Sequence, residues 1–123
     1  NTESYIKNVE KAENSIQSKN EKNLNNSKQL FRPPYGKLKP SQAKKLRKKG
    51  YQIILWDVLS ADFDQSISKE KCLKNVLKNT ENGSVIVFHD SLKAAENLKY
   101  VLPKVLAYFS KKGFVFDSIK VSE

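Results

Sequence analysis

The chain has 123 residues, of which 38% are hydrophobic and 29% charged, as expected for one small globular domain or part of one. Its strongest apolar stretches, residues 51–55 and 84–88, are much shorter than the roughly 18 residues of a membrane-spanning helix, so the sequence offers no such helix. The net charge of +10 suggests an anionic partner, but all of the 23 basic residues except Arg32 and Arg47 are lysines. Lysine lacks the planar fork with which arginine reads phosphates and bases, so nucleic acid is not the expected partner.

Neither the N-terminus nor the cysteine content fixes the cellular compartment. Residues 1–26 are polar and do not resemble a signal peptide. The chain contains no methionine, so we expect that Asn1 is not a translation start and that preceding residues have been removed or lost. Cys72 is the only cysteine, and its apolar neighbours at helical spacing favour a buried structural thiol over a nucleophile.

The first half of the chain predicts two helices and one short strand. Apolar residues fall mostly on one face of residues 2–17, which predicts an amphipathic helix, and residues 18–28 read as a polar loop. Residues 29–31 form a predicted strand that runs into the Pro-Pro-Tyr-Gly turn at 33–36. A second helix is expected at residues 40–49, with Gly50 ending it.

The second half predicts three strands and three helical stretches. Apolar runs predict a strand buried on both faces at residues 51–58 and a second strand at 84–89, and residues 114–119 form a last predicted strand. Ser68 is expected to cap a helix that stops at Asn82-Gly83. Two further helices are expected at residues 92–102 and 103–112, with Pro103 in the first turn of the second.

The alternation of apolar strands with amphipathic helices indicates an α/β fold with parallel strands. The four predicted strands are too few for a complete barrel, which takes about 200–250 residues. We therefore expect a partial barrel or a small open sheet, with residues 1–123 forming a single partial domain.

Polar residues follow three successive predicted strands. Arg32 ends the first strand, Asp57 and Asp62 come with the second, and His89 and Asp90 end the third. Because functional groups gather at the carboxyl ends of parallel strands, these side chains are expected to share one site. A carboxylate that fixes the tautomer of the single histidine would make it a competent general acid.

Three short motifs in this order resemble the polysaccharide deacetylases of carbohydrate esterase family four. Residues 32–36, Arg-Pro-Pro-Tyr-Gly, are similar to the third of the family's five motifs, and residues 87–90, Val-Phe-His-Asp, to the fifth. The fourth motif, Asp-x-x-Asp-Trp, keeps its second aspartate as Asp62 but has Leu59 and Phe63 at its ends. The resemblance covers nearly the whole chain and implies the C-terminal part of a distorted (β/α) barrel.

The resemblance also implies a role for each matching residue. Arg32 would hold the catalytic aspartate, the backbone N–H of Tyr35 would stabilise the oxyanion, and Asp62 would orient His89, the general acid. The residues that would shape the substrate pocket are Pro34, Trp56, Phe63 and Val87.

The metal-binding motifs of the family do not occur in this chain. Thr-Phe-Asp-Asp and His-x-x-x-His would supply the catalytic base and the ligands of a divalent metal, zinc foremost, and both precede the third motif in the family. We therefore expect the chain as given to be inactive. In the complete enzyme it would serve the metal-dependent hydrolysis of N-acetyl groups from a chitooligosaccharide or peptidoglycan. The resemblance suggests an extracytoplasmic or cell-envelope location.

Two other functions remain open on the sequence. Residues 37–49 contain seven basic residues and no acidic one, which favours a non-catalytic module that binds an anionic polymer. A Ser-His-Asp hydrolase using Ser60 or Ser91 is a weaker alternative because no nucleophile-elbow sequence is present. Under the deacetylase interpretation, the missing N-terminal half or self-association is needed to cover an exposed strand edge.

Overall fold

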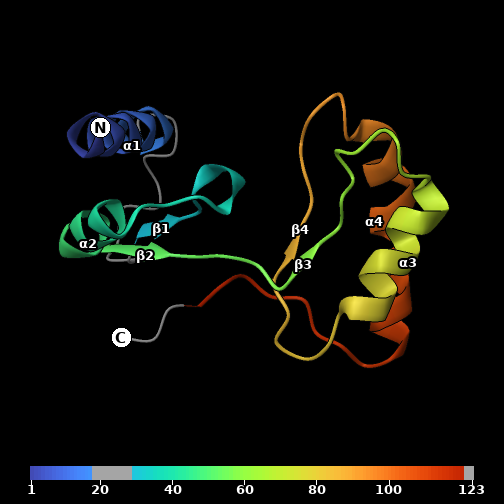
Figure 1. Ribbon diagram of the computed structural model, residues 1–123. Helices are drawn as coiled ribbons and strands as arrows, with labels where there is room; N and C mark the ends of the chain where they lie inside the picture. The colour runs from blue at the N-terminus through green and yellow to red at the C-terminus, as the bar shows by residue number, and fades with distance from the viewer. Residues whose placement is uncertain (18–28, 121–123) are drawn as a thin grey trace. The chain divides into compact units, whose positions relative to one another are not determined.

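A computed structural model describes residues 1–17 and 29–120, which form two compact units. Unit 1 comprises the described residues up to Leu55 together with Lys120, and unit 2 comprises Trp56–Ile119. Each unit has its own pair of parallel strands and its own core (Figure 1). The loop predicted at residues 18–28 lies outside the described residues.

Unit 1 packs two helices against a parallel strand pair. Its elements are α1 (Thr2–Gln17), β1 (Gln29–Phe31), the 3-10 turn η2 (Pro34–Gly36), α2 (Pro40–Lys48) and β2 (Tyr51–Ile53). Ile6, Leu46 and Tyr51 form the buried core. The predicted helix at 2–17 and strand at 29–31 are confirmed, and the second helix ends one residue earlier than expected.

Ion pairs and a hydrogen bond fasten α1 to the rest of unit 1. Glu3 pairs with Lys45, and Glu10 pairs with Lys49 at 2.5 Å. The Tyr51 hydroxyl donates a hydrogen bond to Glu13. Two acidic side chains of α1 therefore face lysines in α2 and at its C-terminal end.

Unit 2 places two helices beside a second parallel pair. Its elements are β3 (Val58–Leu59), α3 (Lys69–Asn79), β4 (Ile86–Val87) and α4 (Ala95–Lys111). Val58 lies opposite Ile86, and Leu59 opposite Val87. The buried core is made by side chains of α3 and α4: Cys72, Val76, Val101, Val105 and Phe109. Ser68 caps α3 as predicted, because its hydroxyl accepts a hydrogen bond from the backbone N–H of Lys71 at 3.1 Å.

The single strand predicted at residues 51–58 is wrong. The chain pairs with β1 only as far as Ile53 and pairs with β4 only from Val58, so two strands with different neighbours replace one. Between them, Leu55 is 53% exposed, so the run is not buried on both faces. The strand predicted at 84–89 is likewise limited to Ile86–Val87.

Two predictions near the C-terminus are also wrong. One helix, α4 (Ala95–Lys111), replaces the two predicted at 92–102 and 103–112, with Pro103 inside it and not in a first turn. The buried side chains of Val101, Val105 and Phe109 stand four residues apart across the proline, and their packing outweighs its cost. Residues 114–119 have no strand partner among the described residues, and Val115 is 86% exposed.

Both strand pairs are parallel and accompanied by helices, which confirms the α/β class. In the part of the chain that is described, no helix is both long and apolar enough to cross a membrane.

Candidate active site

The structure brings Asp62 and His89 into a two-point contact in unit 2. Nδ1 of His89 lies 2.8 Å from Oδ1 of Asp62, and the backbone N–H of His89 donates to Oδ2 at 2.7 Å. The Asp62 side chain is fully buried, whereas that of His89 is 33% exposed. Both carboxylate oxygens of Asp62 are therefore bound by the same residue.

This contact determines which nitrogen of His89 can exchange a proton with a substrate. A carboxylate can only accept hydrogen bonds, so Nδ1 carries a proton whenever Asp62 is ionised. Nε2 is then the atom that gains and loses a proton. Phe63 contacts the His89 ring edge-on, with centroids 5.0 Å apart and an interplanar angle of 72°. The pair has the geometry of a general acid or base beside an apolar wall.

The loop that carries Asp62 is held by residues that the sequence did not single out. Asn75 in α3 donates to the carbonyl oxygens of Leu59 at 2.7 Å and Ser60 at 3.2 Å. Asn97 in α4 donates to the carbonyl oxygen of Asp62 at 3.2 Å. The sequence contains one signal that Asn97 is buried: it stands four residues before Val101, in line with the apolar residues Val105 and Phe109.

Asp57 does not share the site with His89. It precedes β3 instead of following a strand, and it bonds with Val85 at the start of the β3–β4 pair. Its carboxylate accepts from the Val85 N–H at 2.7 Å, and its own N–H donates to the Val85 carbonyl at 2.9 Å. Its role is to begin the strand pair.

The predicted pocket residues of unit 2 lie in different settings. Phe63 is half-buried against His89. Val87 is a strand residue with only 4% of its surface exposed, two positions before His89. Trp56 is the first residue of unit 2 and is half-buried. Their roles in binding a substrate stay predictions.

Arg32, Pro34 and Tyr35 belong to unit 1. Arg32 is exposed and follows β1, and Pro34 begins η2. Tyr35 is 92% exposed and has φ of 57°, in the left-handed region that a residue with a Cβ rarely adopts. Such backbone strain occurs often at functional sites. Their participation in one site with His89 stays a prediction.

The two serines considered as nucleophiles are engaged elsewhere. Ser60 is fully buried, and its hydroxyl accepts a hydrogen bond from the Asp62 N–H at 3.3 Å. The Ser91 hydroxyl accepts from the Ala94 N–H at 3.2 Å. Within unit 2 neither hydroxyl bonds to His89, which weakens the interpretation as a Ser-His-Asp hydrolase.

Cys72 is buried, as the sequence predicted, and its Sγ lies 3.1 Å from the carbonyl oxygen of Ser60. Burial, with a smaller contribution from the negative charge of Asp62, raises the pKa of the Cys72 thiol. A protonated thiol is a poor nucleophile and a poor metal ligand.

The described residues do not fit a divalent metal. Across residues 1–17 and 29–120, no three His, Cys, Asp or Glu side chains come close enough together to share an ion. Asp64 instead accepts hydrogen bonds from the Ser66 hydroxyl at 2.6 Å and N–H at 2.9 Å, which hold the pKa of its carboxyl below the ordinary value. A hydrolytic zinc site takes three protein ligands, so these residues offer no metal-bound step.

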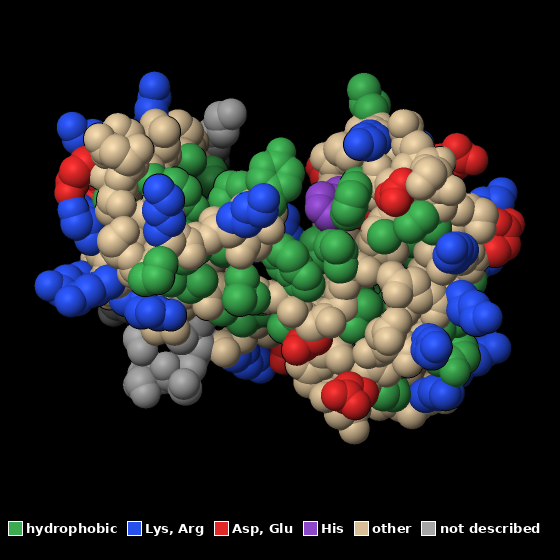
Figure 2. Space-filling model, in the orientation of Figure 1, with side chains coloured by type: hydrophobic (Ala, Val, Ile, Leu, Met, Phe, Trp, Pro, Cys, Tyr) green, Lys and Arg blue, Asp and Glu red, His purple; other side chains and the backbone are tan. Residues whose placement is uncertain are grey.

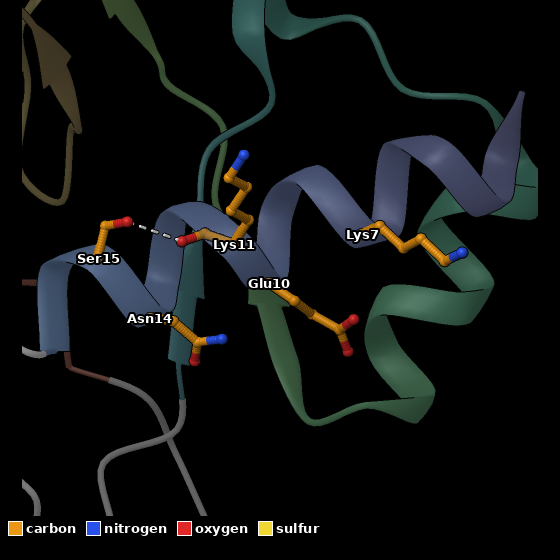
Figure 3. Close-up of a pocket in the computed structure, with 5 residues that line it drawn as sticks. All are labelled: Lys7, Glu10, Lys11, Asn14 and Ser15. Carbon is orange, nitrogen blue, oxygen red and sulfur yellow. Dashed lines mark hydrogen bonds between the residues drawn. The ribbon is translucent and has the colours of Figure 1, made fainter.

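A depression on the surface of α1 is no competing site. Figure 3 shows its five lining side chains, which leave one helix in different directions: Lys7, Glu10, Lys11, Asn14 and Ser15. The hydrogen bond drawn there runs from the Ser15 hydroxyl to the Lys11 carbonyl at 3.0 Å, an ordinary contact within a helix. No group of reactive side chains converges in it.

Positive charge is concentrated in unit 1. Residues 1–17 and 29–55 hold ten basic and three acidic residues, whereas residues 56–119 hold nine and eight. Figure 2 shows Lys and Arg side chains over the surface of α1 and α2. On α2, Lys44, Arg47 and Lys48 are exposed, and Lys44 shares one helix face with Arg47 and Lys48, which follow it by three and four residues. We call these three residues the α2 basic stripe.

Comparison with known proteins connects this geometry to a family, although no family model matches the chain. A peptidoglycan-N-acetylglucosamine deacetylase of Bacillus cereus is 29% identical over 91 residues, which are 73% of this chain and 43% of that protein. The structure of a family 4 carbohydrate esterase from Streptomyces lividans is 32% identical, with a TM-score of 0.58 over 69% of this chain and 42% of that one.

The chain is related to the polysaccharide deacetylases of carbohydrate esterase family four. It resembles their C-terminal portion and spans less than half the length of these two relatives. A pseudoenzyme of the same family from Bacillus anthracis, 20% identical with a TM-score of 0.54, shares the fold. The same fold is therefore found in a protein described as a pseudoenzyme as well as in one described as a deacetylase.

Proposed function

We propose that this chain carries the general-acid side of an enzyme that hydrolyses N-acetyl groups of a carbohydrate. The observation that carries the proposal is the contact of Asp62 with His89, in which a fully buried carboxylate holds Nδ1 and the backbone N–H of a partly exposed imidazole. The relatives support the substrate class, because one is described as a peptidoglycan deacetylase and another as a carbohydrate esterase in complex with acetate.

In this mechanism His89 protonates the leaving amine. When the C–N bond of the tetrahedral intermediate breaks, its electron pair goes to nitrogen, and the proton on Nε2 is transferred to that nitrogen. Asp62 stabilises the imidazolium before transfer and keeps Nδ1 protonated afterwards. Phe63 would contact the acetyl methyl or the sugar beside the ring, together with Pro34, Trp56 and Val87.

The rest of the catalytic machinery is proposed to come from outside these residues. A divalent metal, zinc foremost, and a catalytic base would be supplied by a preceding part of the same domain, which residues 1–123 complete as the C-terminal part of a distorted barrel. Arg32 would hold that base, and the Tyr35 N–H would donate to the oxyanion. By itself the chain would be inactive. An extracytoplasmic location is proposed on the same resemblance.

The proposal is tested by reading the coding sequence upstream of Asn1 and expressing the complete in-frame protein. Acetate release is then measured with N-acetylated chitooligosaccharide and with peptidoglycan. We expect His89→Ala and Asp62→Asn each to lower kcat by about 100-fold or more, which is the usual contribution of general acid catalysis. Thermal unfolding checks that both variants fold.

Asp117→Asn is the matched control, because Asp117 is an exposed carboxylate of unit 2 outside the Asp62–His89 contact, and it accepts a hydrogen bond from the Ser118 N–H at 2.8 Å. It should leave kcat unchanged. Rates near the parent value in both His89→Ala and Asp62→Asn would rule out the acid assignment. A complete protein with neither metal motif would make the chain a non-catalytic relative.

A second function, binding of an anionic polymer, is favoured by the charge of unit 1. Within the described residues, Glu3 and Glu10 of α1 pair with Lys45 and Lys49, while the three side chains of the α2 basic stripe are exposed. Three neighbouring exposed cations on one helix face suit a linear polyanion, since each contact displaces counterions.

This function is tested by measuring Kd for heparin or polyphosphate at several salt concentrations. We expect K44E/R47E/K48E to abolish binding. K71E/K74E/K78E is the matched control, since it reverses three exposed lysines on α3 and changes the net charge equally. Equal losses in both variants, or no binding by the parent at low salt, would exclude a specific surface on α2.

A further inference from the structure

The backbone turns sharply just before Asp62. Ala61 has φ of 65°, a left-handed conformation that is unfavourable for alanine. The Asp64 N–H donates to the Ala61 carbonyl at 3.0 Å, which closes a tight turn around Asp62. Since this turn fixes where the Asp62 carboxylate points, contacts with its backbone decide whether the carboxylate reaches His89.

Asn97 supplies such a contact from α4. Its side-chain amide donates to the Asp62 carbonyl at 3.2 Å and also approaches the Ile67 carbonyl at 3.5 Å. Only 7% of the Asn97 surface is exposed. Because α4 begins at Ala95, the amide reaches the turn from the first part of the helix.

Asn97 occupies a buried position of α4 that lies in line with apolar side chains. It stands four residues before Val101 in the stripe that continues with Val105 and Phe109, all of them buried. An apolar side chain would suit this stripe, whereas a buried amide is costly unless it is hydrogen-bonded. The bonds to the Asp62 turn meet that requirement.

Asn75 holds the other side of the turn from α3. It donates to the carbonyl oxygens of Leu59 and Ser60 at 2.7 and 3.2 Å, and Sγ of Cys72 also contacts Ser60. The backbone before and after Ala61 is thus bound by side chains from two different helices. This arrangement leaves the turn little freedom to move.

We propose that Asn97 is a positioning residue for His89 that acts through Asp62, with Asn75 supporting the opposite side of the turn. Loss of the Asn97 amide would let the Asp62 turn shift, and the carboxylate would no longer hold Nδ1 and the backbone N–H of His89 together. The proposal rests on the proposed function only for its catalytic consequence. Its structural consequence concerns the tautomer of His89.

The tautomer can be measured directly, because His89 is the only histidine of the chain. Imidazole nitrogen resonances in NMR spectra of the chain labelled with ¹⁵N distinguish a proton on Nδ1 from one on Nε2. At a pH where the ring is neutral, the parent chain should show the Nδ1–H form. Asn97→Leu, which keeps the branched shape of the side chain and removes the amide donor, should give a mixture with the Nε2–H form.

Val101→Ala is the matched control, because it creates a cavity in the same helix without removing a contact to the Asp62 turn. It should lower the thermal midpoint and leave the tautomer unchanged. If Asn97→Leu shows no thermal transition, Asn97→Ser takes its place. The proposal is overturned if the Asn97 variant keeps the parent tautomer, or if Val101→Ala changes it equally.

Activity supplies the second readout in the complete protein. Asn97→Leu should lower kcat about 10-fold to 100-fold with KM unchanged, the size of effect expected for a displaced catalytic group. An inactive parent that shows the Nδ1–H tautomer would contradict the proposed function and leave the role of Asn97 intact. An active parent whose His89 tautomer is unchanged by Asn97→Leu would support the proposed function and contradict the role of Asn97.

Discussion

At the scale of single residues, the buried polar side chains of unit 2 are bound to His89 or to the backbone of the Asp62 turn. Asp62 is buried with both oxygens occupied by His89, and Asn97 is buried with its amide on the Asp62 carbonyl. Cys72 is buried beside them, with Sγ on the Ser60 carbonyl. A change in any of these groups should affect the others.

Cys72 gives a prediction about pH. Its pKa is raised in the folded chain, so the folded state retains the proton that an unfolded thiol loses near pH 8.5. The resulting contribution to stability is complete below that pH and declines as the pH rises above it, by at most about 1.4 kcal/mol per pH unit. We expect the urea midpoint to fall between pH 8 and pH 9.5.

Cys72→Ala provides the comparison for this measurement. This variant should be less stable than the parent at every pH because of the cavity. Its urea midpoint should, however, fall less between pH 8 and pH 9.5 than that of the parent. An equal decline in both chains would show that other groups control stability in this range.

Residue identities predicted the Asp62–His89 contact better than the contacts that support it. The ends of successive apolar runs predicted that Asp57, Asp62 and His89 share a site, and the resemblance to polysaccharide deacetylases implied that Asp62 is the partner of His89. Asn75 and Asn97 were missed because asparagine in a helix is usually exposed, and the left-handed Ala61 was missed because alanine carries no signal for that conformation.

At the scale of elements, helices were predicted more reliably than strands. Local signals define α1 and α3: an apolar face in the first and the Ser68 cap in the second. The run at 51–58 looked like one strand because apolar composition does not show where a chain changes its pairing partner. Hydrogen-bond partners distant in sequence decide that.

Pro103 gives a prediction at this scale. Proline inside a helix removes a backbone hydrogen bond and costs about 3 kcal/mol relative to alanine, yet α4 continues through it because its core-facing stripe is packed on α3. Pro103 is exposed, so Pro103→Ala should raise the urea midpoint without disturbing the core. Leu102→Ala, on the neighbouring half-buried position, should lower it. A less stable Pro103→Ala chain would show that the proline is needed for the path of α4.

At the scale of the whole molecule, two separate pairs of short parallel strands contribute little stability. Two-stranded sheets are marginal without further strands or helix packing, and several large apolar side chains are exposed, among them Leu55 and Phe116 at 53% and 47%. The α/β class followed from the sequence, because alternation of strands and helices is a property of the pattern. The division of the described strands into two separate pairs did not follow, because it depends on which distant segments of the chain pair with each other.

We accordingly predict that the 123-residue chain is poorly stable as a monomer. Its thermal midpoint should lie below about 45 °C, the lower end for mesophilic domains, or its sedimentation coefficient should rise with concentration as exposed apolar surface is covered. Calorimetry and analytical ultracentrifugation on the same sample check both. A sharp transition of a monomer at higher temperature would contradict the prediction.

The separation of Asp62 from its partners along the chain has a consequence for biosynthesis. His89, which binds the Asp62 carboxylate, follows it by 27 residues, and Asn97, which binds the Asp62 backbone carbonyl, follows it by 35, so both donors leave the ribosome after Asp62. Until then the carboxylate stays in water, since burying it without partners is unfavourable. The Asp62 turn can therefore close only after α3 and the start of α4 have been synthesised, and a ribosome stalled before residue 97 would hold a nascent chain without a formed site.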